Sequence, residues 1–350
     1  MASVARMLTA TRGRGRLDWT DWASYAYLLL GVLVMFGPVL WLGLSSLKSA
    51  AGLNEYPPTL LPREQIRVAV PGFANKLPLF EITKGPQEGK TLAEVRRIGL
   101  QATMVDPAQP EPSLRVPIGD RTKVMQTHAA WENYADLIGK FSFFRYFGNS
   151  IFITVVATVL TLLVNSMAAF ALSKYRFPGR EPVFLIMLAT LMIPPTIVLV
   201  PNYLIAASLG LTNNLWGVIL PAVATPTGVF MLRQYMLTLP DDLIEAARMD
   251  NASEWRIYWR IVLPLSAPAL AVLAIFSVMW RWNEFLWPMV VLSRSEVFTL
   301  PLALFSFQGD LETQWNYLLA MTVLTLLPVT LIFVVLQRYI TQGIASAGVK

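Results

Sequence analysis

Six long apolar stretches dominate the pattern of hydrophobic and polar positions along the chain. Each is long enough to cross about 30 Å of hydrocarbon as a helix of roughly 20 residues. The predicted spans lie near residues 23–47, 147–172, 182–206, 214–237, 266–292 and 317–338. The pattern therefore predicts an all-α polytopic membrane protein with six transmembrane helices.

A long polar segment, residues 48–146, follows the first predicted span. It is rich in proline and charge and contains short alternating runs such as "QIRVAV" and "LFEIT", which are typical of half-buried strands. We expect a small, β-rich insertion here, after a region 1–47 that holds the N-terminus and the first helix. A five-helix core, 147–338, and a tail, 339–350, complete the expected organisation.

Composition and charge agree with a membrane location and predict an orientation. The chain of 350 residues is 55% hydrophobic and 14% charged, against about 25% charged residues in soluble domains. Lysine and arginine gather at the N-terminus, in the loops near 173–181 and 239–264, and in the tail. Because such residues mark cytoplasmic loops, we expect both termini in the cytoplasm, the insertion outside, and the first helix retained as a membrane anchor. The net charge of +6 follows largely from the same bias and does not indicate nucleic-acid binding.

The residue inventory argues against catalysis and metal binding by this chain. It has no cysteine and one histidine, His128, so thiol chemistry and cysteine- or histidine-rich metal sites are not expected. The spans contain no serine–histidine pair and no carboxylate cluster. We therefore expect no catalytic residue and no metal site in this chain, which argues against an enzyme.

The stretch "KGPQEGKTLAEV", residues 84–95, resembles the start of a phosphate-binding loop. That loop needs four residues between its glycines, whereas three separate Gly85 from Gly89, and Pro86 removes one of the backbone N–H groups. We interpret the stretch as a turn between two extended segments, on the external side and away from cytoplasmic ATP.

The loop 239–264 carries the most specific information. Asp241 and Asp242 suit a helix N-terminus, and an apolar face follows at helical spacing. The chain breaks at Asp250-Asn251, and Ser253 can cap a second helix that Pro264 is expected to end at the membrane. Two short amphipathic helices are predicted; they could dock on a partner or lie on the lipid surface.

This loop resembles the EAA loop of ABC importer permeases. Glu245-Ala246-Ala247 precedes position 251 and "IVLP" by the family's spacing, with Asn251 where the family has glycine; asparagine tolerates the left-handed conformation of such a turn. The resemblance extends to "NSIFIT" at 149–154, "AAFALSKYRFPGR" at 168–180, "NYLIAASLGLTNN" at 202–214, "WNEF" at 282–285 and "LQRYITQGIASAGVK" at 336–350. Together these resemble the MalG-like, binding-protein-dependent permeases of carbohydrate uptake, over about 20–47 and 140–350 but not over 50–135.

The resemblance implies a type I ABC importer permease fold, a location in the bacterial inner membrane and a set of partners. These are a second, unlike permease subunit, two ATPase subunits that bind ATP and magnesium, and an external sugar-binding protein; this chain itself would need no cofactor. The residues expected to couple to the ATPases are Glu245, Ala246, Ala247, Asp250, Asn251 and Pro264. The C-terminal residues Gln342, Gly343 and Gly348 would also contact them, and residues around 305–310 would reach the binding protein.

Four polar residues inside the predicted spans are candidates for the transport pathway: Asn165, Arg281, Asn283 and Glu284. Ionisable groups at membrane depth often mark a pathway, and Arg281 and Glu284 are spaced to pair on a helix. A structural ion pair and a helix–helix hydrogen bond explain them equally well. An ion-gradient-driven secondary transporter and a polytopic membrane enzyme remain the alternatives to a sugar importer.

Overall fold

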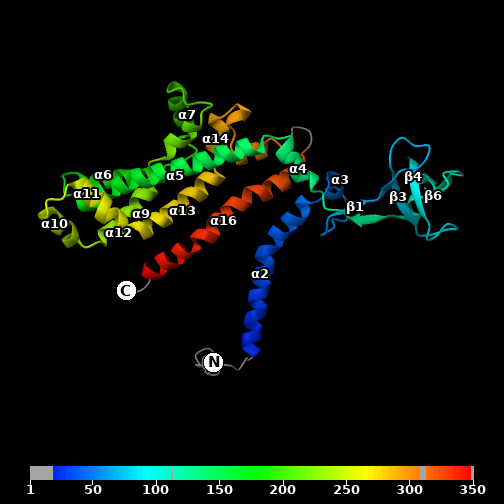
Figure 1. Cartoon of the computed structure of the whole chain (residues 1–350), viewed down its shortest axis with the longest axis horizontal. Helices are drawn as coiled ribbons and strands as arrows, with labels where there is room; N and C mark the ends of the chain where they lie inside the picture. The colour runs from blue at the N-terminus through cyan, green and yellow to red at the C-terminus, as the bar shows by residue number, and fades with distance from the viewer. Residues whose placement is uncertain (1–18, 112, 308–312, 348–350) are drawn as a thin grey trace. The chain divides into compact units, whose positions relative to one another are not determined.

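The computed structural model describes residues 19–111, 113–307 and 313–347, with side chains described as far as Val334. It separates after Ala130 into two compact units (Figure 1). The first unit holds one long helix and the strands, and the second holds the remaining helices. The boundary places residues 131–146, at the end of the predicted insertion, with the helical unit.

The helix α2, Trp19–Ser46, opens the first unit and is exposed along almost its whole length. Its apolar 28 residues include Pro38 without a break in the helix. Apolar side chains that face outward on all sides of a helix are typical of contact with lipid or with another membrane subunit. This helix coincides with the first predicted span.

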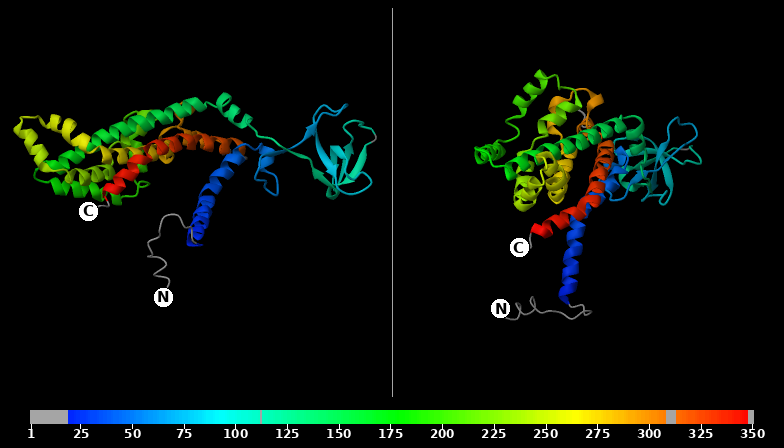
Figure 2. Two further views of the ribbon diagram at one scale, coloured as in Figure 1. Left: turned by 60° about the horizontal axis from the view of Figure 1, so that its bottom comes forward. Right: turned by 60° about the vertical axis from the view of Figure 1, so that its left-hand side comes forward.

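The strands of the first unit lie between residues 63 and 127, inside the predicted insertion. The elements are α3 Ala50–Leu53, β1 Arg63–Gln65, β2 Arg67–Val68, β3 Leu77–Ile82, β4 Thr91–Ile98, β5 Gln101–Val105, β6 Leu114–Pro117, the short 3-10 helix η1 Ile118–Asp120, β7 Arg121–Lys123 and β8 Met125–Thr127. Strands β3 to β6 form an antiparallel meander, visible in Figure 2. β2 and β7 lie end to end along the free edge of β3, and β1 pairs separately with β8.

A small apolar core stabilises this sheet. Phe80, Ile82, Leu92 and Met104 are buried against one another, as alternation along β3 to β5 predicts. Arg121 lies over the Phe80 ring and forms an ion pair of 2.6 Å with Glu94. The sheet therefore has its own core and could fold as a local unit.

The stretch that resembles a phosphate loop is a hairpin turn. It joins β3 to β4, and the Gly89 N–H donates to the Ile82 carbonyl at 2.9 Å. Gly85 and Gly89 take φ values of +105° and +81°, which explains both glycines without a ligand. The interpretation as a turn is confirmed.

The helical unit begins at α4 and is built around the long helix α5. Its elements are α4 Glu132–Gly139, α5 Phe143–Lys174, α6 Arg180–Ala189, η2 Thr190–Met192, α7 Leu199–Ser208, α8 Leu215–Ile219, η3 Leu220–Ala222, α9 Pro226–Leu237, α10 Asp241–Met249, α11 Glu254–Ile257, the π-helical turn η4 Tyr258–Val262, α12 Leu263–Leu265, α13 Ala267–Asn283, α14 Leu286–Val291, η5 Ser295–Val297, α15 Leu300–Phe305 and α16 Trp315–Ala347. α5 packs against α9 and α13, and α13 packs against α16 (Figures 1 and 2).

The predicted third span, 182–206, is not one continuous helix. α6 and η2 end at Met192, turns occupy 193–198, and α7 begins at Leu199. Pro194 and Pro195 explain the break, since proline lacks the N–H for an intrahelical bond and clashes with the preceding turn. The predicted span 182–206 is thus divided into two helical segments at its two prolines.

The fourth predicted span, 214–237, is bent, since its segments Leu215–Ala222 and Pro226–Leu237 meet at 45°. A second bend, of 76°, joins Glu254–Leu265 of the loop 239–264 to Ala267–Asn283 at the start of the fifth predicted span. That span, 266–292, divides at Glu284 into α13 and α14. We expected Pro264 to end its helix, and this expectation is wrong. Pro264 lies inside α12, and the bend falls at Ser266. Proline is tolerated there because it stands in the first turn of α12.

By length and composition, three helices of the described chain could each cross a membrane. They are Trp19–Ser46, Phe143–Lys174 and Trp315–Val334, and the number rises to five if each bent pair is one span. The molecule is thus a helical, multi-pass membrane protein that also carries a small sheet.

Candidate functional site

The start of α10 is bonded to Lys174, the last residue of α5. Asp241 and Asp242 occupy its first turn, where carboxylates complement the helix dipole. The buried ammonium of Lys174 donates to the Leu239 carbonyl at 2.7 Å and to Asp241 Oδ1 at 2.6 Å. This hydrogen bond from Lys174 holds the pKa of Asp241 below its usual range.

The two faces of α10 differ. Ile244 is buried, and Ala247 packs half-buried against the same apolar cluster of the helical unit. Glu245 and Ala246 are exposed, as is Met249 with 82% of its surface accessible. An exposed face with small and apolar side chains is what a partner's groove would meet.

The chain reverses at Asp250 and Asn251. Asn251 has a φ of +58°, the left-handed conformation that glycine adopts freely and asparagine tolerates. The Ala252 N–H donates to the Ala247 carbonyl and the Asn251 N–H to the Arg248 carbonyl, both at 3.0 Å. These bonds satisfy carbonyls at the C-terminus of α10. The turn predicted from the asparagine is confirmed.

A small charged cluster closes the loop. Ser253 Oγ accepts from the Arg256 N–H at 3.3 Å and caps α11, as predicted. Glu254 accepts from Arg248 Nε at 2.9 Å and from the Tyr175 hydroxyl at 2.8 Å. The bond from Arg248 lowers the pKa of Glu254, whereas burial and then Glu254 raise the pKa of Tyr175 to about 12. The two arms of the loop are therefore joined to each other and to the residue after α5.

The second arm is anchored in the helical core. The Tyr258 hydroxyl and Ser166 Oγ form a buried hydrogen bond of 2.7 Å, and Ile257 and Val262 are fully buried. The π-helical turn η4 places Tyr258 toward α5, and widened turns of this kind are frequent at functional sites. The second arm of the loop is therefore held against α5 by a buried contact.

Asn165 is buried inside the helical unit and forms a helix–helix contact. Its Nδ2 donates to Thr225 Oγ1 at 2.6 Å, and its Oδ1 accepts from the Thr225 N–H at 3.1 Å. Thr225 precedes α9, where Pro226 begins the helix and the bend occurs. Of the two interpretations left open, the contacts favour the structural hydrogen bond.

Arg281 and Glu284 line a cavity of about 170 Å³ between α7, α8 and α14, together with Asn202 and Trp287. The guanidinium of Arg281 donates to Thr161 Oγ1 at 3.1 Å and to the Ala222 carbonyl. Glu284 accepts from Trp280 Nε1 at 3.0 Å and from the Trp287 N–H at 3.2 Å. The spacing suggested a pair, but within the described chain the two side chains bond to other groups.

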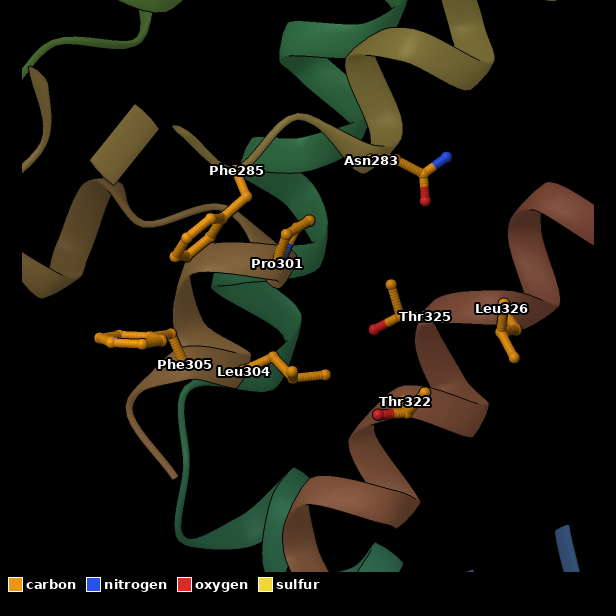
Figure 3. Close-up of a pocket in the computed structure, with 8 residues that line it drawn as sticks. All are labelled: Asn283, Phe285, Pro301, Leu304, Phe305, Thr322, Thr325 and Leu326. Atoms are coloured by element: carbon orange, nitrogen blue, oxygen red, sulfur yellow. The ribbon is translucent and has the colours of Figure 1, made fainter. Parts of the chain in front are cut away.

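Asn283 faces a different space. It lines a pocket of about 380 Å³ together with residues of α15 and α16 and the segment after α13 (Figure 3). The lining residues are Asn283, Phe285, Pro301, Leu304, Phe305, Thr322, Thr325 and Leu326. The structure thus separates Asn283 from Arg281 and Glu284, and it brings Asn283 together with Phe305.

Sequence reasoning missed several of these groups. Thr322 and Thr325 lie three apart on α16 and share one face, a spacing that could have identified them. Lys174, Tyr175 and Glu254 gave no such signal, because the residues that meet lie more than 60 positions apart. Among the C-terminal candidates, Gln342 and Gly343 lie in α16 beyond the described side chains, and Gly348 lies outside the described residues.

Comparisons with known proteins place this geometry in a family. Residues 165–346 match the family described as "Binding-protein-dependent transport system inner membrane component". The arabinooligosaccharides transport system permease protein AraQ of Halalkalibacterium halodurans is 42% identical over 208 residues, 59% of this chain and 75% of that protein. The sn-glycerol-3-phosphate transport system permease protein UgpE of Yersinia pestis is 35% identical over 201 residues, 57% of this chain and 72% of that protein.

A solved structure shares the fold. It is a bacterial ABC transporter involved in the import of the acidic polysaccharide alginate, with a TM-score of 0.67, 23% identity, and coverage of 94% of this chain and 99% of that one. The uncovered 6% of 350 residues is about 21 residues, far fewer than the segment 48–146 holds. The likeness in fold therefore extends into that segment, which the sequence resemblance did not reach.

The family match and the relatives confirm the resemblance drawn from the loop 239–264. The relatives are named as transport system permease proteins. These names favour the importer over the two alternatives, a membrane enzyme and an ion-gradient-driven transporter. The chain belongs to the inner membrane components of binding-protein-dependent transport systems.

Proposed function

We propose that this chain is the permease subunit of an ATP-driven importer for a sugar, delivered by an external binding protein. The cargo is proposed from its relatives, whose names cover an arabinooligosaccharide, a phosphorylated polyol and an acidic polysaccharide. All of these carry several hydroxyl groups. The observation that supports the mechanism best is the loop 239–264, which presents an exposed small-residue helix on an arm anchored in the core.

Coupling would proceed through α10. Glu245 and Ala246 lie on its exposed face, where a small side chain permits close approach and a carboxylate can accept hydrogen bonds from an ATPase cleft. Asp250 and Asn251 set the turn, and Pro264 lies on the arm that leads to α13. Closure of the ATPases on ATP would move the loop as a rigid body, and the Tyr258–Ser166 bond would transmit that motion to α5, as alternating access requires.

The topology we propose has six spans, with both termini in the cytoplasm and the sheet-bearing segment 48–146 outside. The three long helices and two bent pairs supply up to five. The segment α6–α7, broken by Pro194 and Pro195, would supply the sixth, because broken helices are tolerated where they line a cavity. The cavity beside Pro195 includes Arg281 and Glu284, which remain pathway candidates.

The proposed assembly contains a second, unlike permease and two ATPase subunits, which would hold ATP and magnesium. The exposed apolar surface of α2 suits contact with lipid or with that second permease. The tail, with Gln342, Gly343 and Gly348, would add a further contact with an ATPase.

The test is a pull-down of the tagged full-length chain from mild detergent, followed by mass spectrometry. We expect an ATPase and a second permease to co-purify, and the ATPase activity of that complex to rise when a sugar-loaded binding protein is added. Recovery of the chain alone, or only with copies of itself, would contradict the proposed assembly.

A further inference from the structure

We propose that the pocket between α13, α15 and α16 is a contact site for a neutral saccharide, and that the cargo is uncharged rather than acidic or phosphorylated. This inference rests on the proposed function and deepens it. The relatives leave the charge of the cargo open, because their names include both neutral and anionic compounds. The chemistry of the pocket decides between them.

The polar groups of the pocket offer mainly hydrogen-bond acceptors. Thr322 Oγ1 donates to the Leu318 carbonyl at 2.7 Å, and Thr325 Oγ1 donates to the Met321 carbonyl at 2.8 Å. Both hydroxyl protons are therefore used within α16, and the oxygens keep lone pairs. Figure 3 shows these oxygens on the side of α15, bordering the pocket.

Asn283 adds a third acceptor. One N–H of its Nδ2 donates to the Met279 carbonyl at 2.7 Å, which leaves its Oδ1 with no hydrogen bond from the described residues and its second N–H available to a ligand. Three acceptor oxygens and one neutral donor suit a ligand whose O–H groups both donate and accept, as those of a sugar do. A phosphate or a carboxylate needs several donors, preferably charged ones, and this pocket offers one neutral donor.

The pocket also lacks charge. Its eight lining residues include no lysine, arginine, aspartate or glutamate. The neighbouring charges of α13 lie elsewhere, since Arg281 and Glu284 line the separate cavity beside α14. An anion placed here would lose its hydration without a compensating cation, at a large cost in free energy.

The remaining surface suits the apolar faces of a sugar ring. Phe285 and Phe305 lie with ring centroids 5.5 Å apart, inclined by 50°, and Leu304 and Pro301 complete the wall (Figure 3). The volume of about 380 Å³ falls in the range of roughly 300–1,000 Å³ that small-molecule sites occupy.

The helix α13 connects the pocket to the loop 239–264. α13 begins at Ala267, directly after the bend that follows the loop, and ends at Asn283 in the pocket. Its 17 residues span about 25 Å at 1.5 Å per residue. A tilt of this helix would therefore alter the pocket as the loop moves.

The first experiment uses the absence of cysteine from the chain. Thr325→Cys and Thr330→Cys are introduced singly into the complex reconstituted in liposomes, and the rate of methyl methanethiosulfonate modification is followed by mass spectrometry during ATP turnover. The probes are arabinotriose and maltotriose, which are neutral, and trimannuronate and sn-glycerol 3-phosphate, which are anionic. Thr330 is the matched control, because it is exposed on α16 with the same hydroxyl-to-carbonyl bond and lies outside the pocket.

We expect a neutral trisaccharide at twice its dissociation constant to slow modification of Thr325→Cys about threefold, because the rate follows the fraction of sites left unoccupied. Modification of Thr330→Cys should not change. Three results would each overturn the proposal. The anionic probes could protect Thr325→Cys as well as the neutral ones do, or none of the four probes could protect it. In the third, Thr325→Cys would not react at all while Thr330→Cys reacts.

The second experiment measures uptake. The double substitution Thr322→Val and Thr325→Val keeps the side-chain shape and should raise KM for the neutral sugar roughly tenfold, as the loss of two hydrogen bonds predicts. Thr330→Val should leave KM unchanged. If the wild-type complex carries only an anionic substrate, this inference fails and the importer proposal stands; if it carries no saccharide or polyol at all, the proposed function itself fails.

Discussion

At the scale of single residues, Asn251 has the clearest physical reason for its identity. The loop 239–264 must reverse direction between α10 and α11 within a few residues. A φ of +58° at position 251 achieves this, and most side chains pay for that conformation through a clash of Cβ with the backbone. Asparagine replaces the glycine of the family pattern at little cost, so we expect the loop to keep its geometry.

We predict that Asn251→Gly leaves the protein unchanged, whereas Asn251→Ala destabilises the loop by roughly 1–2 kcal/mol, the cost of a Cβ in the left-handed region. The measurement is binding-protein-stimulated ATP hydrolysis by the purified complex, together with its thermal midpoint. Glycine is the matched control, since it removes the amide side chain without the strain. A loss of activity in Asn251→Gly would show that the amide itself contributes a contact.

At the scale of elements, α10 shows why two adjacent alanines are not equivalent. Ala247 packs half-buried against the apolar cluster that holds Ile244, whereas Ala246 is exposed on the outer face. The sequence placed both in one coupling motif. Only their angular positions on the helix separate a residue that can face a partner from one that supports the fold.

We predict that Ala246→Trp lowers binding-protein-stimulated ATP hydrolysis at least about tenfold, equivalent to 1.4 kcal/mol of lost docking free energy. The bulky ring would be kept out of a narrow groove while the permease itself folds. Ala247→Trp should instead reduce the yield of folded protein, because overpacking strains a close-packed core. Ala246→Ser is the control, and normal coupling in Ala246→Trp would refute docking through this face.

The contact between α5 and α9 depends on a glycine, Gly228, which has no Cβ. A Cβ added at Gly228 would overlap with Nδ2 of Asn165 and would lie 2.6 Å from Thr225 Oγ1. Glycine therefore allows Asn165 to reach the start of α9 and bond to Thr225. The same arrangement explains why a buried amide is tolerated there.

We predict that Gly228→Ala lowers the thermal midpoint of the detergent-solubilised protein by several degrees, about 1–3 kcal/mol of overpacking. In an Asn165→Ala background the same substitution should cost less, since the amide that it meets is gone. This double-mutant comparison isolates the contact. Equal costs in both backgrounds would mean that Asn165 does not position α9.

At the scale of the whole molecule, the two compact units have different compositions. The strands from β2 to β7 surround their own small core, and the helices from α4 onward surround larger apolar clusters. The glycine-rich turn that resembles a nucleotide loop belongs to the first of these. In the topology we propose, it faces away from the ATPases.

Lys90→Ala is accordingly predicted to leave ATP hydrolysis by the assembled complex within about twofold of wild type, as surface substitutions cost at most about 0.5 kcal/mol. Lys90 is exposed in the turn before β4. Lys90→Arg serves as the conservative comparison. Abolished hydrolysis in Lys90→Ala would show that the turn takes part in nucleotide chemistry after all.

The sequence alone determined the class of protein, the family, and the start and the turn of the loop 239–264. Those conclusions depend on local patterns: apolar length, the carboxylates before α10, the cap at Ser253 and the turn at Asn251. Each of these patterns depends on residues only a few positions apart, so sequence spacing is enough to predict it.

Only the tertiary structure decided how the polar residues of the spans are used. It showed that Asn165 bonds across to Thr225 and that Arg281 reaches the Ala222 carbonyl instead of Glu284. It also divided the candidates Asn283 and Arg281 between two cavities, and it bent the chain at Ser266 rather than at Pro264. These outcomes depend on which helices pack together and at what rotation, because a side chain's partners across a bundle are set by contacts between distant segments and not by its own local sequence.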